Sequence, residues 1–155
     1  MSAGPASSPR HVHPPVWLLL HAAAALALDH WLPLRTVILA PWTDLALLPG
    51  LLGALLVLWC VVLFRRHDTP ILPFTETTAL VAAGPYRLSR NPIYVGLVLL
   101  LMSLVVLLGT LGPWFVLPSF WLILRQRFVI KEEALLRARF GPAYEAFCTR
   151  VPRWI

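Results

Sequence analysis

LALLPGLLGALLVLWCVVLF, residues 45–64, is a run of twenty residues without a charged side chain. About 20 apolar residues in a helix span the hydrocarbon core of a bilayer. The whole chain has the same character, because 59% of its 155 residues are hydrophobic and 13% are charged, against about 25% charged residues in a typical soluble domain. The sequence therefore predicts an all-α integral membrane protein with a single domain.

Three further apolar segments accompany this run. They cover residues 16–32, with a broken extension toward residue 40, then 94–108, and then 114–124, which can continue as helix to residue 139. Gly109 to Pro113, GTLGP, is typical of a tight turn and makes the last two segments a helical hairpin. We expect a bundle of about four transmembrane helices.

The basic residues indicate the orientation of this bundle. Of the thirteen Lys and Arg residues, only Arg35 falls between the first and second segments, so 12 lie on the other side of the membrane. By the positive-inside rule, both termini and the loop of residues 65–93 are cytoplasmic, and we expect the location to be a bacterial inner membrane. The net charge of +6 does not predict nucleic-acid binding, because these residues flank apolar segments instead of forming a stripe on a soluble face.

The two ends of the chain are less apolar. Residues 1–15 are rich in Pro, Ser and Ala and predict a disordered tail, so the domain covers residues 16–155. Residues 130–155 predict two short amphipathic helices, broken at Gly141-Pro142 and lying over the cytoplasmic surface as interfacial helices.

Polar residues gather in GPYRLSRNPIYVG, residues 84–96, at the start of the third apolar segment. Asn91-Pro92 is a good helix start, since Asn caps free N–H groups and Pro suits the first turn. A capped helix with Arg90 as a basic interfacial anchor explains part of the cluster. The alternative is a binding site, in which free backbone groups of the preceding loop contact an adenine or an amino acid.

An adjacent pair of acids, Glu132 and Glu133, follows the fourth apolar segment. Only one of two adjacent helical residues can face the hairpin. We expect Glu133 to pair with a basic neighbour such as Arg137 at i,i+4, which leaves Glu132 to hold a cationic group such as an amine. Both polar clusters then lie at the two feet of one hairpin. The sequence has no CxxC pair and no histidine cluster at zinc-ligand spacing, so no metal is predicted.

These motifs resemble the isoprenylcysteine carboxyl methyltransferase and phospholipid methyltransferase superfamily of small integral membrane enzymes. The resemblance rests on GPYRLSRNPIYVG, the Glu-Glu pair and the final RFGPAYEAFCTRVPRW, and it covers about residues 78–154. It implies S-adenosylmethionine as cofactor, held in the region of residues 78–155, and a lipophilic or small methyl acceptor that offers a carboxylate, thiol or amine.

The resemblance also implies which residues hold the cofactor. Asn91 replaces the family's histidine, and Asn can form hydrogen bonds but does not titrate near neutral pH. The cofactor-binding residues are Thr78, Ala79, Leu80, Val81, Gly84, Tyr86, Arg90, Asn91, Pro92, Tyr94 and Glu132. No residue is assigned a catalytic role.

One departure from the family concerns the acceptor. Phe128 stands where isoprenylcysteine methyltransferases place an arginine for the substrate carboxylate, which argues against a prenylcysteine substrate. Arg125 and Arg127 are the nearby candidates for substrate binding. Two other functions stay open, a non-catalytic scaffold or degenerate family member and a reductase similar to membrane sterol reductases. The sequence does not predict the oligomeric state.

Overall fold

The computed structural model of the chain describes residues 13–66, 80 and 82–155. Regular elements in these residues are all helical, which confirms the predicted all-α class, and an isolated bridge joins Thr36 to Thr110. The elements are α1 (Pro14–Trp31), η1 (Trp42–Ala46), α2 (Leu47–Arg66), η2 (Gly84–Arg87), α3 (Pro92–Leu108), η3 (Gly112–Phe115), α4 (Val116–Leu124), η4 (Arg125–Val129), α5 (Ile130–Phe140) and α6 (Pro142–Arg150).

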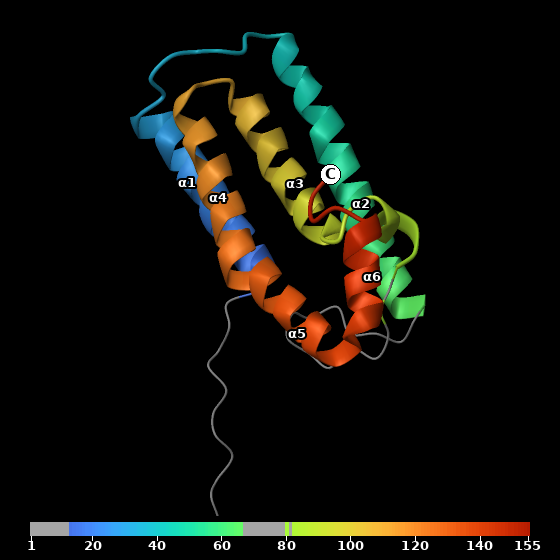
Figure 1. Ribbon diagram of the computed structural model, residues 1–155. Helices are drawn as coiled ribbons and strands as arrows, with labels where there is room; N and C mark the ends of the chain where they lie inside the picture. The colour runs from blue at the N-terminus through green and yellow to red at the C-terminus, as the bar shows by residue number, and fades with distance from the viewer. Residues whose placement is uncertain (1–12, 67–79, 81) are drawn as a thin grey trace, which may run out of the picture.

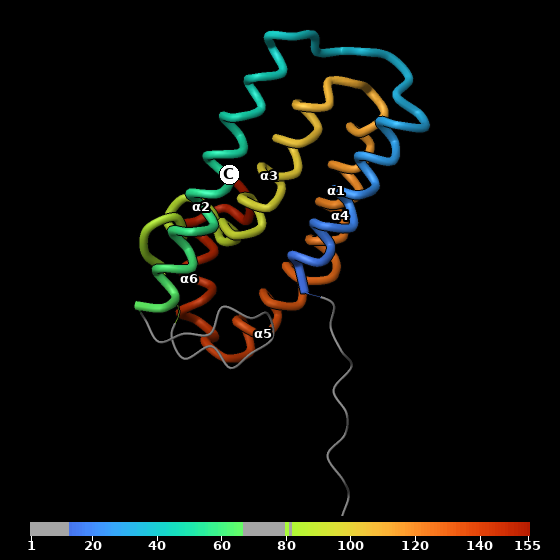
Figure 2. The backbone as a smooth tube through the Cα atoms, turned by 180° about the vertical axis from the view of Figure 1, so that it is seen from behind, coloured from blue at the N-terminus to red at the C-terminus, as the bar shows by residue number. Residues whose placement is uncertain are grey.

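Four helices lie alongside one another in the body of the molecule (Figure 1). α1 lies next to α4, and α2 lies next to α3. The contact between α2 and α3 is the most extensive contact between two helices in the described residues. α4, the π-helix η4 and α5 follow one another without a break, and α5 and α6 gather at one end of the bundle. The connection from α1 to α2 crosses the opposite end, as the view from behind also shows (Figure 2).

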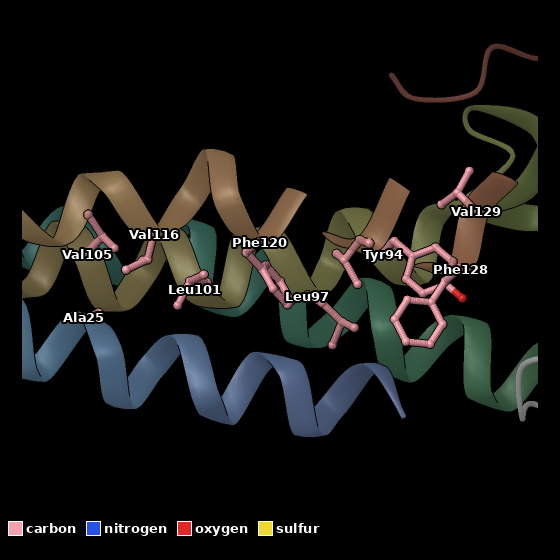
Figure 3. Close-up of a cluster of buried hydrophobic side chains, with 10 residues drawn as sticks. Ala25, Tyr94, Leu97, Leu101, Val105, Val116, Phe120, Phe128 and Val129 are labelled. Carbon is pink, nitrogen blue, oxygen red and sulfur yellow. The ribbon is translucent and has the colours of Figure 1, made fainter. Parts of the chain in front are cut away.

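The bundle core forms between α3 and α4, with α1 against them (Figure 3). α3 contributes residues at i, i+4 and i+8, the spacing of one helix face, and α4 contributes a matching set. These residues are Leu97, Leu101 and Val105 of α3, Val116, Phe120 and Leu124 of α4, and Ala25 of α1. The core therefore fixes the two helices whose feet carry the predicted polar clusters.

α2 has a different relation to the core. Its buried residues are Gly53 and Cys60, whereas leucines such as Leu51 and Leu55 are more than half exposed. Such an exposed apolar face suits a helix whose outer surface meets lipid. By length and composition, residues 42–66 form one helix apolar enough to cross a membrane, and α3 is apolar but shorter. The four spans expected from the sequence thus remain a prediction.

Glycines let α2 and α3 approach closely, as small residues do at helix interfaces in membranes. A Cβ at Gly53 would lie 2.7 Å from the carbonyl oxygen of Gly96, and a Cβ at Gly96 would lie 2.6 Å from Val57 Cγ2. Ser103 adds a polar contact, because its hydroxyl donates to the carbonyl of Ala46 at 2.7 Å. This seam holds the start of α3 against α2.

The hairpin turn forms where the sequence predicts it. Gly109 ends α3 in the left-handed conformation with φ 72°, which favours glycine. The segment after α1 packs on this turn, since the amide of Val37 donates to Gly109 and that of Leu111 donates to Arg35. Thr110 donates a hydrogen bond to Asp29 of α1.

Element boundaries differ slightly from those expected. α1 and α3 each begin two residues earlier, at Pro14 and Pro92, because proline fits the first turn of a helix. α1 ends at Trp31, so the possible extension toward residue 40 is not helical. The break at Gly141-Pro142 between the two C-terminal helices is confirmed. The predicted disordered tail lies outside the described residues, apart from residues 13–15.

Replacement of Gly53 by alanine tests the α2–α3 seam. The new methyl group would overlap a backbone oxygen that cannot rotate away, and overpacking costs about 1–3 kcal/mol, more than the ~1 kcal/mol that alanine gains in helix propensity. We expect Gly53→Ala to lower the thermal unfolding temperature of the protein in detergent. Leu52→Ala, on the exposed face of the same helix, is the control. An unchanged unfolding temperature for Gly53→Ala would contradict the seam.

Candidate functional site

The first polar cluster folds as η2 and the start of α3. Gly84 has φ +56° and lies against Trp59 of α2, where a Cβ would approach the indole to 3.3 Å. Tyr86 is buried, and its ring lies 5.6 Å from that of Phe64. Gly84 and Pro85 thus begin a short 3₁₀-helix that turns Tyr86 inward against α2.

Tyr94 and Glu132 join the two feet of the hairpin. The Tyr94 hydroxyl donates to Glu132 Oε1 at 2.7 Å. Tyr94 is buried on the first turn of α3, and its ring lies 6.1 Å from that of Phe128 (Figure 3). Among the described residues, no cation pairs with Glu132. The arrangement therefore leaves a carboxylate that is oriented but not neutralised.

A π-helix, η4, precedes Glu132 and carries Phe128. Single π turns within α-helices occur often at functional sites. Here the π turn presents Phe128 and Val129 to the core at its Tyr94 end (Figure 3). Phe128 thus forms an apolar wall beside the Tyr94–Glu132 bond.

Burial alters the acid–base properties of this site. Burial raises the pKa of Glu132, and the hydrogen bond from Tyr94 lowers it to a smaller degree. Burial also raises the pKa of Tyr86, with a further increase from the nearby Cys60 and from the charge of Glu132. Glu132 is therefore a proton-accepting group whose ionised form is costly and is stabilised by a cation brought to it.

Glu133 lies in a separate buried cluster. Its carboxylate accepts bonds from Arg153 Nε at 2.8 Å and Nη2 at 2.7 Å, and Arg90 Nη1 lies 3.2 Å away. Arg90 Nη1 also donates to Cys148 Sγ at 2.8 Å. The Glu133 side chain is only 6% exposed, so the two arginines supply the charge that its burial requires. The expected division of the glutamate pair, with Glu133 beside basic neighbours, is confirmed.

The expected partner of Glu133 is wrong. Arg137 instead donates to Glu145 of α6, and both side chains are about half exposed. Glu133 points away from this exposed face, toward the residues that follow α6. An i,i+4 spacing makes a contact available, but Arg153, which is partly buried, provides the stronger bidentate partner.

Asn91 occupies the N-cap position of α3 without capping it through its side chain. The side-chain amide instead donates to the carbonyl oxygen of Arg153 at 3.0 Å, and Ser89 donates to the same oxygen at 3.3 Å. The cap predicted from the sequence is therefore wrong in its chemistry, because the side chain donates to the end of the chain and its oxygen accepts no hydrogen bond from the first turn of α3.

Arg125 and Arg127 lie on η4 but face different neighbours. Arg125 lies over the ring of Trp121, 5.9 Å from its centroid, and Arg127 lies over Trp17 of α1 at the same distance. Each guanidinium group thus lies against an indole and not against the Tyr94–Glu132 bond. Their assignment to substrate binding stays a prediction.

The structure brings together only part of the predicted cofactor site. Tyr94 and Glu132 are in contact. Arg90 instead contacts Glu133, and Asn91 contacts the carbonyl of Arg153. Leu80 packs beside the cluster of Tyr144, Phe147 and Val151. Thr78, Ala79 and Val81 lie outside the described residues, and so do His67 and Asp68.

Sequence reasoning missed the contribution of the last residues of the chain. Cys148 contacts Arg90 and the carbonyl of Arg153 contacts Asn91, and both Arg90 and Asn91 are predicted site residues. One property of the sequence could have indicated this contribution, namely the small number of acidic residues. With seven acidic residues for thirteen basic ones, a buried glutamate is expected to attract more than one arginine, but which arginines approach depends on tertiary structure.

Comparison with known families matches residues 41–143 to the phospholipid methyltransferase family. The matched range includes the apolar helix of spanning length, Trp42–Arg66, and both Tyr94 and Glu132. The match covers more than half of the chain, so this protein belongs to the phospholipid methyltransferase family, and membership implies a membrane methyltransferase. No curated protein and no solved structure matches the chain.

Proposed function

We propose that the protein is an S-adenosylmethionine-dependent integral membrane methyltransferase whose site lies around Tyr94 and Glu132. It acts on a lipophilic or small acceptor at the cytoplasmic face of the membrane, and its helices span the bilayer about four times. The observation that carries the proposal is the hydrogen bond of 2.7 Å that holds the Glu132 carboxylate at the foot of the hairpin, where the described residues place no cation against it. Family membership supports the reaction class.

The residues present fit a cofactor with an amino-acid end. Glu132 accepts one hydrogen bond from Tyr94, and a carboxylate has capacity for several. A cationic amine at its remaining lone pairs would balance the charge that burial makes costly. When bound, S-adenosylmethionine supplies a methyl group on a positively charged sulfur, which an acceptor carboxylate, thiolate or neutral amine can attack.

The surrounding residues orient groups and exclude water. Tyr94 fixes the direction of the Glu132 carboxylate, and the buried rings of Tyr86 and Phe128 form apolar walls. A dry, oriented site favours methyl transfer, because the acceptor and the methyl carbon must align and water must not compete. The described part of the site has no obvious general base other than Glu132, which suits an acceptor that arrives already deprotonated.

The acceptor is best described as lipophilic. The outer face of α2 exposes apolar side chains, and Phe128 rather than a cation stands beside Tyr94. An acceptor with an apolar body approaching from the membrane would therefore meet compatible surfaces. Arg125 and Arg127 are the cations available to an acidic group outside this apolar wall.

Substitution of Glu132 and Tyr94 tests the cofactor site. Hydrogen bonds to charged groups contribute about 1.5–3 kcal/mol, so Glu132→Gln should weaken binding of S-adenosylhomocysteine about tenfold or more. Tyr94→Phe leaves the carboxylate but frees its orientation and should weaken binding by a smaller factor. Calorimetry on the purified protein measures both affinities.

Glu145→Gln is the matched control, since Glu145 forms an exposed pair with Arg137 and should keep the affinity of the unaltered protein. Full affinity in both Glu132→Gln and Tyr94→Phe would refute the site.

The pH dependence of binding tests the role of the Glu132 charge. Burial raises the pKa of Glu132 above that of an ordinary glutamate, which is about 4.3. Binding of an amine requires the ionised form, so affinity should rise with pH up to that raised pKa and then level off. The facing groups Tyr94 and Tyr86 stay neutral at these pH values.

The raised pKa of Glu132 also affects the folding stability of the protein without ligand, and this effect has the opposite direction with pH. The folded state favours the protonated acid, so folding stability should fall as pH rises from the ordinary glutamate pKa to the raised one. Titrations at pH values below about 7 avoid deprotonation of an α-amino group, whose pKa is about 7.7–8.0. In Glu132→Gln both dependences should flatten, and an unchanged profile in that variant would assign them to another group.

Orientation can be tested separately from chemistry. Arg65 and Arg66 end α2 near the end of the bundle where α5 and α6 gather (Figure 1), whereas Arg35 bonds to the hairpin turn at the opposite end. By the positive-inside rule the α5–α6 end should be cytoplasmic. A C-terminal fusion to a protein that fluoresces only in the cytoplasm should be bright, and a dark but fully expressed fusion would reverse the orientation.

A further inference from the structure

The last residues of the chain run across the start of α3. We call Val151–Trp154 the C-terminal strap. Its backbone pairs with the first polar cluster, because the amide of Arg90 donates to the carbonyl of Pro152 at 2.9 Å. The next carbonyl, that of Arg153, accepts from the side chains of Asn91 and Ser89. The strap therefore makes three hydrogen bonds to the segment that leads into Tyr94.

The side chain of Arg153 extends from the strap to α5. Its guanidinium holds both carboxylate oxygens of Glu133, at 2.8 and 2.7 Å. Bidentate pairs of this kind fix direction as well as charge. Arg90, at 3.2 Å from the same carboxylate, makes a weaker single contact.

One residue thus bonds to a sequence neighbour of each partner in the Tyr94–Glu132 bond, to Asn91 near Tyr94 and to Glu133 beside Glu132. Asn91 lies three residues before Tyr94, at the entry to the same helix. Glu133 follows Glu132 directly, and adjacent residues of an α-helix differ by about 100° in direction. Fixing Glu133 toward the strap therefore sets the direction of Glu132, while fixing Asn91 sets the start of the helix that carries Tyr94.

A second contact anchors the strap on α4. The ring of Trp154 lies 5.7 Å from that of Trp121, and Trp154 also packs against the bundle core. The strap is therefore held at both ends, at α3 through backbone bonds and at α4 through an aromatic pair. Arg153 lies between these anchors and beyond the residues that the family match covers.

We propose that Arg153 is a positioning residue for the candidate site, one that tethers α3 and α5 so that Tyr94 and Glu132 meet. The proposal rests on the proposed function for its link to cofactor binding. Arg153 bonds to Glu133 and Asn91, and its effect on the Tyr94–Glu132 pair passes through these two residues.

Binding of S-adenosylhomocysteine measures this effect. Arg153→Ala should weaken binding about tenfold, and Arg153→Lys, which keeps the charge but loses the bidentate geometry, should fall between Arg153→Ala and the unaltered protein. The control is Arg150→Ala, because Arg150 is exposed and donates to a carbonyl within its own helix. Full affinity in Arg153→Ala would overturn the proposal.

A double-mutant cycle separates positioning from general loss of stability. If Arg153 acts through Glu132, adding Arg153→Ala to Glu132→Gln should weaken binding by less than about twofold further. A full tenfold additional loss would show that Arg153 acts elsewhere and would also overturn the proposal.

A readout that needs no cofactor distinguishes this proposal from the proposed function. The chain has three tyrosines, so fluorotyrosine labelling should give three ¹⁹F resonances, and Tyr94→Phe assigns one of them. Arg153→Lys should shift the Tyr94 resonance, and Arg150→Ala should not. A shifted resonance in a protein that binds no S-adenosylhomocysteine supports the tether while rejecting the proposed function; an unshifted resonance rejects the tether.

Discussion

The hydrogen bond between Tyr94 and Glu132 joins residues 38 positions apart in the sequence. Its two partners stand at the feet of the helices that form the bundle core, so the packing of α3 on α4 is what brings them within reach. The core residues of these helices repeat at i,i+4, and Phe128, further along from the buried Phe120, lies beside Tyr94. The site is therefore a consequence of core packing as much as of its own polar contacts.

Charge imbalance explains how two adjacent glutamates come to differ. The chain has far more basic than acidic residues, so a buried carboxylate readily finds cations, and Glu133 has two. Glu132 has a phenol instead of a guanidinium as its partner. A neutral donor orients a carboxylate without satisfying its charge. That difference is what makes Glu132, and not Glu133, suited to a cationic ligand.

The sequence allowed the prediction of features that depend on local chemistry and on the antiparallel direction of successive helices. Apolar runs bounded by proline and glycine predicted the helices, the turn at Gly109 and the break at Gly141-Pro142. The hairpin placed Tyr94 and Glu132 at the same end because its two helices are antiparallel. Tertiary contacts decided what could not be predicted. Arg153, not Arg137, is the partner of Glu133, and the Asn91 side chain donates to the Arg153 carbonyl and does not cap α3.

The π-helix η4 separates the cations of this region from the site. Arg125 and Arg127 stack on indoles of α4 and α1, and Phe128 between these positions and Glu132 is buried against Tyr94. An acidic acceptor group placed beside Tyr94 would meet an aromatic ring and a carboxylate, which is unfavourable for a buried negative charge. Under the proposed function, the reactive group of the acceptor is then neutral at the moment of transfer, or its charge stays near the stacked arginines. A neutral nucleophile on an apolar body therefore fits the proposed site better than a buried carboxylate.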